Sequence, residues 1–290
     1  MAQTNIPSPS ELNYFVEVAS TLNISRAAER LGISQPSLSL AIQRLEASFG
    51  IPLLLRGKSG VRLTPAGQKL VVQARSLLGE WENIRSVALK DETEISGRFT
   101  IGCHVSVALF SLNRFLPHLL QEYPAIEFKL AHDLSRRITE AVVSYKVDFG
   151  IVVNPVAHPD LVIRQLFFDE VSLWIGPESC NRDVLVCDAE LIQSQSIMKQ
   201  FASKGFNFKR TITSTSLEVV TSLTAAGAGV GILPRRIATG NKKDGLKPFA
   251  KNSPKFHDQI CLVYRADTQK SLAARTMANA IVTSLKCETN

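Results

Sequence analysis

The sequence contains few cysteines and no long hydrophobic run. Its five cysteines are scattered over 290 residues without a CxxC pair, so neither a disulfide framework nor a zinc site is indicated. No apolar stretch approaches the roughly 18 to 20 residues of a membrane-spanning helix. The N-terminus lacks the basic segment followed by an apolar one that is typical of a secretory signal. We therefore expect a globular, cytoplasmic protein without metal or cofactor.

Acidic residues are scarce in one part of the chain. Residues 199–255 carry 11 lysines and arginines but only two acidic residues, whereas residues 99–198 carry seven basic and 12 acidic residues. The whole chain has a net charge of +7. An anionic effector or partner near the C-terminal part would explain the basic block, and so would a solvated, lysine-rich surface; we favour the second explanation. The length and the 45% hydrophobic content allow two or three domains with their own cores.

Residues 25–50 predict two short helices joined by a tight turn. Ser25 can cap the first helix and Gly32 can end it, while Ser34 can cap the second, which tolerates Pro36 in its first turn. Apolar residues of the second helix recur at spacings of three and four and predict one buried stripe, namely Leu38, Ala41 or Ile42, Leu45 and Phe49. An ordinary helical hairpin would share these features, so the neighbouring residues decide the interpretation.

The opposite face of the second helix carries side chains that can hydrogen-bond base edges and phosphates in a major groove. These residues are Gln35, Ser37, Ser39, Gln43 and Arg44. After Gly50, two apolar runs around a glycine-rich tip predict a β-hairpin, in which Arg56, Lys58 and Arg62 would meet the flanking phosphates. Helix, turn, helix and basic hairpin together predict a winged helix-turn-helix domain.

Two further helices are predicted around this domain. Ser8, Pro9 and Glu11 form a capping box, so a supporting helix should run from Pro9 to about Ser20, with an apolar stripe of Leu12, Phe15, Val16 and Ala19. Thr64 and Pro65 begin a helix of about 25 residues. The a/d rhythm of a coiled coil continues along it through Leu70, Ala74, Leu77, Trp81, Ile84 and Ala88. This seam predicts a dimerisation helix, although it could instead pack on the chain's own second domain.

From the polar segment 91–98 onward, strand and helix patterns alternate as in βαβ units. Strands are expected at 99–103, 126–131, 149–153, 161–168, 171–175, 183–187, 210–214 and 258–265, with another after the glycines at 227–231. Helices are expected at 105–122, 135–145, 190–205, 217–226 and 272–285. The fold class is therefore α/β, and two lobes joined by crossing strands would enclose a cleft, as in periplasmic binding proteins. The GxGxG string at 227–231 follows a helix, not a strand, which argues against nucleotide binding.

Ligands of open α/β sheets collect beyond the carboxyl ends of the strands and near helix N-termini. This rule selects the loops after the first three strands, including His132 and Asp133, and the loop after the strand at 210–214. The candidate effector-binding residues are Cys103, His104, Ser106, Ser135, Asn154, Ser194, Gln195 and Thr213. The set offers hydrogen-bond donors and no acid, so we expect a small carboxylate or similar oxyanion, with His104 strengthening its binding when protonated. A neutral or apolar ligand is the alternative.

Cysteine chemistry is the other way in which this region could act. Cys103 and His104 are neighbours on a strand and point to opposite faces, so they cannot readily pair as nucleophile and base, and we do not expect an enzyme. Cys180 and Cys187 are a weak candidate pair for peroxide sensing.

Residues 11–75 resemble the N-terminal domain of LysR-type transcriptional regulators. The resemblance is carried by Ala27-Ala28, Leu31, Ser34-Gln35-Pro36-Ser37-Leu38-Ser39, Ile42, Leu45-Glu46, Gly50, Pro52-Leu53, Arg56, Leu63-Thr64 and Gly67, and LTAAGAGVGILPRR at 223–236 resembles part of the family's effector domain. It implies that Gln35, Pro36 and Ser39 lie at the DNA with Arg56 at the wing, and that His104, Ser106 and Ser135 contact effector. Leu40 stands where the family usually has a basic residue, which suggests apolar contact with a thymine methyl instead.

The resemblance implies a regulator with three parts. These are a DNA-binding domain at 1–64, a dimerisation helix at 65–90 and an effector-binding domain at 91–290. Such a protein would bind double-stranded promoter DNA as a homodimer or homotetramer and respond to a small molecule. A ligand-independent DNA binder and an enzyme on a binding-protein-like fold are the alternatives.

Overall fold

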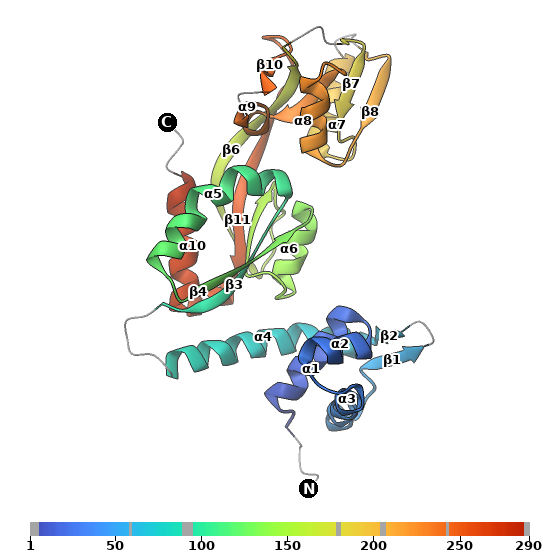
Figure 1. Cartoon of the computed structure of the whole chain (residues 1–290), viewed down its shortest axis with the longest axis vertical. Helices are drawn as coiled ribbons and strands as arrows, with labels where there is room; N and C mark the ends of the chain where they lie inside the picture. The colour runs from blue at the N-terminus through green and yellow to red at the C-terminus, as the bar shows by residue number, and fades with distance from the viewer. Residues whose placement is uncertain are drawn as a thin grey trace. The chain divides into compact units, whose positions relative to one another are not determined.

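The computed structural model describes residues 6–57, 60–88, 95–177, 181–203, 207–241 and 244–286 (Figure 1). The chain forms two compact units, one of Met1–Glu94 with Ser144–Lys146 and the other of Ile95–Val143 with Val147–Asn290. The long linker helix belongs to the first unit together with the winged domain, and the two α/β lobes form the second.

The first unit is a winged helix-turn-helix, as predicted. Its elements are α1 (Pro9–Thr21), α2 (Ile24–Leu31), α3 (Gln35–Phe49), β1 (Leu54–Gly57), β2 (Gly60–Leu63) and α4 (Pro65–Ala88). Phe15, Leu38, Ile42 and Leu45 are fully buried in its core. Val18 also is buried, whereas Val16 and Ala19 of the expected α1 stripe are only partly buried, so the core side of α1 is rotated from the predicted one.

Helix caps explain most of these boundaries. The Ser8–Glu11 capping box begins α1, and Ser34 Oγ accepts the Ser37 backbone N–H at 3.3 Å at the start of α3. Gly32 ends α2 in the left-handed region with φ of 66°, which a residue with a side chain rarely adopts. The prediction that Ser25 caps α2 is wrong. Asn23 does so, because its Oδ1 accepts the Arg26 N–H at 3.0 Å, and α2 begins before Ser25.

The second unit contains one mixed sheet with the strand order β4-β3-β5-β11-β6-β9-β7-β8, and β10 pairs with β6. The first lobe comprises β3 (Gly97–Cys103), α5 (Val105–Glu122), β4 (Ile126–His132), α6 (Ser135–Val143), β5 (Phe149–Val153), the short helix η2 (Ala266–Lys270) and α10 (Leu272–Lys286). The second comprises β7 (Val184–Cys187), α7 (Ile192–Ser203), β8 (Arg210–Thr213), α8 (Leu217–Ala225), β9 (Val230–Pro234), α9 (Arg235–Gly240) and β10 (Lys247–Pro248). In the first lobe α5 and α10 pack on one face of the sheet and α6 on the other.

Two long antiparallel strands, β6 (Leu161–Ile175) and β11 (Phe256–Arg265), connect the lobes (Figure 1). The sequence predicted two separate strands at 161–168 and 171–175, and the structure shows one. Asp169 and Glu170 interrupt the apolar pattern but stay in the strand, where Asp169 is the partner of Asp258 on β11. These crossing strands give the lobes the arrangement expected from periplasmic binding proteins.

Candidate DNA-reading surface and effector region

Helix α3 presents the predicted polar face to the surface of the first unit. Gln35 is exposed and its Nε2 donates to Ser39 Oγ at 3.3 Å, and the Ser34 and Ser37 hydroxyls lie 2.7 Å apart. Pro36, Gln43 and Arg44 also are exposed, and so is Leu40. These side chains therefore form a continuous surface from which a groove could be contacted.

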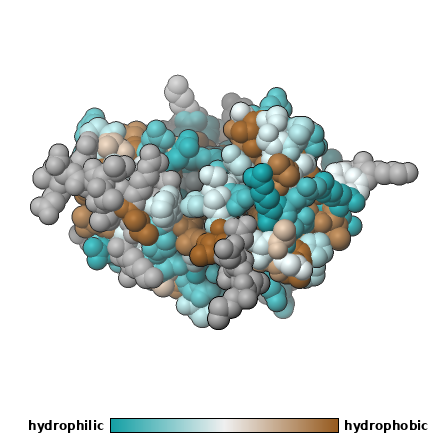
Figure 2. Space-filling view, turned by 90° about the horizontal axis from the view of Figure 1, so that it is seen from below, coloured by the Kyte–Doolittle hydropathy of each residue, from teal (hydrophilic) through white to brown (hydrophobic). Residues whose placement is uncertain are grey.

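Phe49 was predicted to belong to the buried stripe, and this prediction is wrong. Its side chain is 44% exposed because it lies on the last residue of α3, beyond the core. It lines an apolar hollow of about 180 Å³ together with Leu12, Leu70 and Leu77. Figure 2 shows apolar residues reaching the surface in separate patches on the face that it displays.

The wing is anchored to the recognition helix by one carboxylate. Glu46 Oε1 on α3 accepts the backbone N–H groups of Leu53 and Leu54 at 2.8 and 3.0 Å, just where β1 begins. The Val61 N–H also donates to the carbonyl of Leu22 at 3.0 Å. These bonds fix the direction of the hairpin relative to α3. The sequence predicted no role for Glu46 beyond its place in the family motif, because its spacing from the hairpin does not indicate a contact with β1.

The predicted basic residues of the wing are placed as follows. Arg56 on β1 and Arg62 on β2 are both exposed, in a register that pairs Arg56 with Val61 and Leu55 with Arg62. Lys58 lies outside the described residues.

The predicted dimerisation seam divides into a buried part and an exposed part. Ala74 is 2% exposed and packs in the core of the first unit, and Leu70 is partly buried there, so Ala74 is corrected from a partner contact to a core residue. Leu77, Trp81 and Ile84 remain 58%, 51% and 56% exposed. The side chain of Ala88 lies outside the described residues.

In the first lobe, the ends of three parallel strands bring several predicted residues to one edge of the sheet. His104 caps α5, because its Nδ1 accepts the Ser106 backbone N–H at 3.3 Å, and Ser106 Oγ lies 2.7 Å from the same nitrogen. Ser135 Oγ, at the start of α6, accepts the Val153 N–H at 3.0 Å at the end of β5. His132 Nδ1 is 3.2 Å from the carbonyl oxygen of Cys103. The expectation that ligands collect beyond the carboxyl ends of the strands thus located this group of residues.

The cap decides which ring nitrogen of His104 can meet a ligand. Nδ1 is occupied by the Ser106 backbone N–H, so Nε2 is the nitrogen that remains for a ligand contact. Ser106 is itself buried and acts by holding this ring.

Three other predicted residues are engaged elsewhere. Cys103 is fully buried in the first lobe's core and burial raises its pKa to about 12, so it is corrected from an effector contact to a core thiol. Asn154 adopts a φ of 49°, its Nδ2 donates to Asp258 Oδ1 at 2.7 Å, and its Oδ1 accepts the Gln259 N–H at 2.8 Å. Ser194 on α7 is 1% exposed and does not face open surface.

In the second lobe, Gln195 and Thr213 are exposed near neighbouring parallel strand ends. The Ser214 N–H donates to the Cys187 carbonyl at 3.1 Å, and Gln195 Nε2 donates to the Ala189 carbonyl at 3.1 Å. Burial raises the pKa of Cys187 to about 11, and Asp188 contributes, which is the opposite of what a peroxide-reactive thiol requires. Cys180 lies outside the described residues.

Two buried carboxyl groups lie on the crossing strands, and sequence reasoning missed both as functional candidates. Asp169 and Asp258 are cross-strand partners with 5% and 2% of their surface exposed. Burial raises the pKa of each to about 6, and Arg236 opposes the shift of Asp169. Asp169 also accepts the Arg236 N–H at 3.4 Å at the start of α9. Aspartate inside the apolar run of β6 was the available signal.

Comparison with known protein families identifies the architecture. Residues 9–68 match the bacterial regulatory helix-turn-helix protein family of LysR type, and residues 92–286 match the LysR substrate binding domain. The chain belongs to the LysR family. LysR-type proteins are transcriptional regulators, which agrees with the winged domain and the two-lobed domain described above.

Relatives of this LysR-type chain include regulators from several bacteria. It is 28% identical over 286 residues to the DNA-binding transcriptional dual regulator OxyR of Escherichia coli K12, with 93% of each chain covered. It is 32% identical over 168 residues to the regulator BbuR of Bordetella bronchiseptica, covering 58% of this chain and 52% of that protein, so the match spans about half the length of BbuR.

Solved structures of LysR-type regulators have the same fold. Full-length OxyR from Pseudomonas aeruginosa superposes with a TM-score of 0.71 at 21% identity, covering 96% of this chain and 94% of that one. CbnR in complex with its target DNA gives a TM-score of 0.60 at 21% identity, covering 96% and 99%. Among the described residues of this LysR-type chain, no helix is long and apolar enough to cross a membrane, and no group of three or more His, Cys, Asp or Glu side chains could hold a metal ion.

Proposed function

We propose that this LysR-type regulator reads promoter DNA through α3 and the wing, acts as a homodimer or homotetramer in the cytoplasm, and responds to a small anionic effector bound at the strand ends of the two lobes. The observation that carries the proposal is the exposed polar face of α3, held in a fixed direction relative to the wing by Glu46. Cys103 Sγ lies 4.0 Å from His132 Nδ1, but burial raises the pKa of this thiol to about 12, which does not favour a nucleophile.

The DNA contacts follow from the chemistry of the exposed side chains. The Gln35 amide can make a bidentate contact to adenine, and Leu40 offers apolar surface to a thymine methyl. Arg56 and Arg62 on the wing would contact phosphates, which positions the protein without specifying sequence. Pro36, Ser37, Ser39, Gln43 and Arg44 would complete the surface together with Ser34.

Oligomerisation follows from the exposed part of the α4 seam. Leu77, Trp81 and Ile84 recur at the a/d spacing and expose more than half of each side chain. Large apolar side chains aligned on one helix face are typical of an interface with another chain. A dimer would present two α3 helices and therefore recognise two half-sites.

The effector proposal rests on the polar residues at the strand ends. His104 Nε2, Ser135, Gln195 and Thr213 supply hydrogen-bond donors near the starts of helices, where anions are favoured. A small carboxylate satisfies these groups better than an amine does, because an amine would supply donors of its own.

Selection of preferred duplexes from a random DNA library by the full chain tests DNA reading. We expect enrichment of a sequence with two related half-sites, and enrichment of none would overturn the regulator proposal. Effector binding is tested separately, by thermal shift of the full chain with small acids and their neutral amides. Thr213→Ala should reduce the shift given by an acid, whereas Thr211→Ala, an exposed threonine earlier on β8, should not. If amides stabilise the chain as well as acids do, the neutral ligand is favoured over the anion. If no compound stabilises it, the ligand-independent DNA binder is favoured.

A further inference from the structure

Leu40 occupies the middle of the outward face of α3. Leu38 is fully buried, and at about 100° per helical residue Leu40 points roughly away from the core. Leu40 is 49% exposed, and it belongs neither to the core cluster of the first unit nor to the partly buried residues around that cluster. Pro36, one turn earlier on the same face, also is exposed. The two residues therefore place apolar surface at the centre of the helix face that would enter a major groove.

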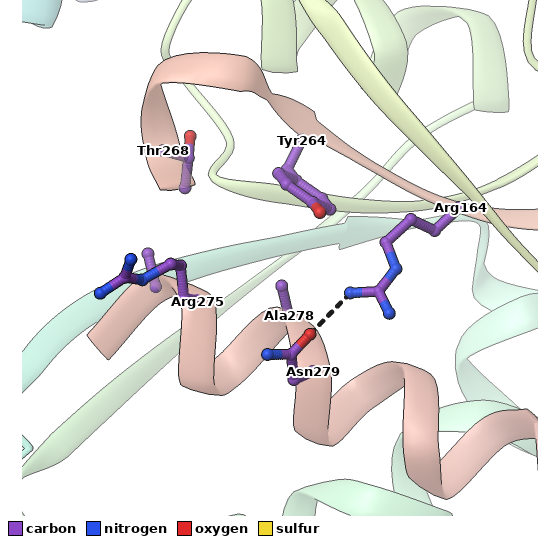
Figure 3. Close-up of a pocket in the computed structure, with 7 residues that line it drawn as sticks. Arg164, Tyr264, Thr268, Arg275, Ala278 and Asn279 are labelled. Carbon is purple, nitrogen blue, oxygen red and sulfur yellow. Dashed lines mark hydrogen bonds between the residues drawn. The ribbon is translucent and has the colours of Figure 1, made fainter. Parts of the chain in front are cut away.

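Exposure distinguishes this apolar surface from the hollow beside α10 in the second unit (Figure 3). In that hollow Tyr264 and Ala278 are only 2% and 3% exposed, and Arg164 Nη1 donates to the Asn279 amide oxygen at 2.8 Å. The apolar residues of the hollow are thus already covered by their own lobe. About half of Leu40 remains in water, so a molecule that contacts α3 gains free energy by covering it.

Charged groups are scarce around Leu40. In α3, all of which the structure describes, the only charged side chains are Arg44 and Glu46, and Glu46 accepts two backbone N–H groups at the start of β1. Gln35 Nε2 donates to Ser39 Oγ at 3.3 Å on the flank of the same face. No cation precedes Arg44 in this helix to hold a phosphate, so the first part of α3 is suited to contact base edges.

The major groove offers one apolar group to such a surface, the 5-methyl group of thymine. 5-Methylcytosine carries the same methyl group at the same ring position. We propose that Leu40 reads a pyrimidine 5-methyl group in each half-site, so that thymine or 5-methylcytosine is preferred there over cytosine. This inference rests on the proposed DNA-reading function of α3, and it adds to that function a dependence of binding on cytosine methylation.

The test uses the full chain and the duplex that selection enriches, with binding followed by fluorescence anisotropy. Each thymine is replaced in turn by deoxyuridine, which lacks only the 5-methyl group. Removing the methyl group that Leu40 contacts should weaken binding about fourfold, which corresponds to about 0.8 kcal/mol for one buried group of this size. At that position, 5-methylcytosine should bind more tightly than cytosine by a similar factor. The proposal is wrong if every deoxyuridine duplex binds as tightly as its parent, or if methylation of the cytosine has no effect.

Variants of the chain show whether Leu40 is the residue that reads the methyl group. Leu40→Ser should bind the thymine and deoxyuridine duplexes alike, and Leu40→Arg should do the same while its affinity depends more steeply on salt. Gln35→Ala should bind both duplexes more weakly and keep the fourfold ratio. Val156→Ser, at an 81% exposed apolar position of the second unit, should change neither the affinity nor the ratio. A fourfold ratio that persists in Leu40→Ser would overturn the assignment.

This inference and the proposed function fail in different ways. Enrichment of no duplex would remove DNA reading altogether. An enriched duplex whose affinity is independent of its pyrimidine methyl groups would remove only the role of Leu40. Because Leu40 is exposed, its replacement should leave the first unit folded, and the melting temperatures of the variants check this.

Discussion

Replacing Asp258 by asparagine should stabilise the second unit, and more so at higher pH. Asp258 is 2% exposed, and its ionised form is disfavoured by burial, which raises its pKa from the ordinary 3.8 to about 6. Asparagine has nearly the same shape and keeps an oxygen that can accept the Asn154 N–H now donated to Asp258 Oδ1. The variant removes the buried charge while the hydrogen bond can persist.

The magnitude follows from the difference between the folded and unfolded pKa. Between pH 3.8 and 6 the folded state binds more protons than the unfolded state, so stability falls as pH rises through this window and is level above it. A difference of roughly two units corresponds to a cost of about 3 kcal/mol above pH 7, of which about half is already present at pH 5. Asp258→Asn removes this cost. It also relieves the repulsion that Asp258 exerts on Asp169, which acts in the same direction.

Urea unfolding followed by tryptophan fluorescence can measure this effect. The chain has two tryptophans, Trp81 and Trp174, so in a Trp81→Phe background the buried Trp174 reports on the second unit. The advantage of Asp258→Asn should grow by about 1.4 kcal/mol between pH 5 and pH 8. A changed neutral hydrogen bond would add the same offset at each pH, so the growth is diagnostic. Asp183→Asn, whose side chain is 59% exposed, is the control. A pH-independent difference, or an advantage that shrinks as pH rises, would refute the reasoning.

Two further predictions concern the first unit. Leu77→Glu with Trp81→Glu should give monomers and much weaker binding to a two-half-site operator, because the exposed seam would be charged at its centre. Light scattering measures the mass, and Gln68→Glu, at an exposed position on the opposite face of α4, is the control. An unchanged mass of the double variant would reject a dimerising helix. Gln35→Ala should weaken DNA binding by roughly 1 to 3 kcal/mol and relax the preference at one base pair. Arg56→Ala should weaken binding to all duplexes alike and reduce the slope of log affinity against log salt concentration by about 1. Equal changes of this slope in salt titrations of both variants would contradict the assignment.

Local signals predicted the element boundaries well. The helix at Val105–Glu122 and the strand at Phe149–Val153 have the predicted bounds, and capping residues located the starts of α1, α3 and α4. A cap depends on side chains within three residues of the helix start, so it can be found without tertiary information. The error at α2 has the same origin, because Asn23 and Ser25 are both good caps and only the backbone conformation decides between them.

Spacing showed which residues share a helix face but not what that face meets. The a/d rhythm of α4 correctly grouped Ala74 with Leu77, yet Ala74 is covered by the chain's own helices while Leu77 is exposed. In the same way, strand order predicted that Cys103 and His104 lie at a strand end. It could not show that Cys103 points into the core and that His104 begins the next helix.

The buried acids could not be found by local reasoning, because their meaning depends on pairing between distant strands. Asp258 touches Asn154 at the end of β5 in the first lobe, and Asp169 touches the start of α9 in the second. The Asn154 N–H favours the ionised form of Asp258, since it donates to the carboxylate. A ligand that drew Asn154 away from Asp258 would therefore raise the pKa of that carboxyl group further, and by reciprocity ionisation of Asp258 would oppose binding of such a ligand. The two buried acids on the crossing strands therefore contact both lobes, Asp258 at the strand ends of the first lobe and Asp169 at the start of α9 in the second.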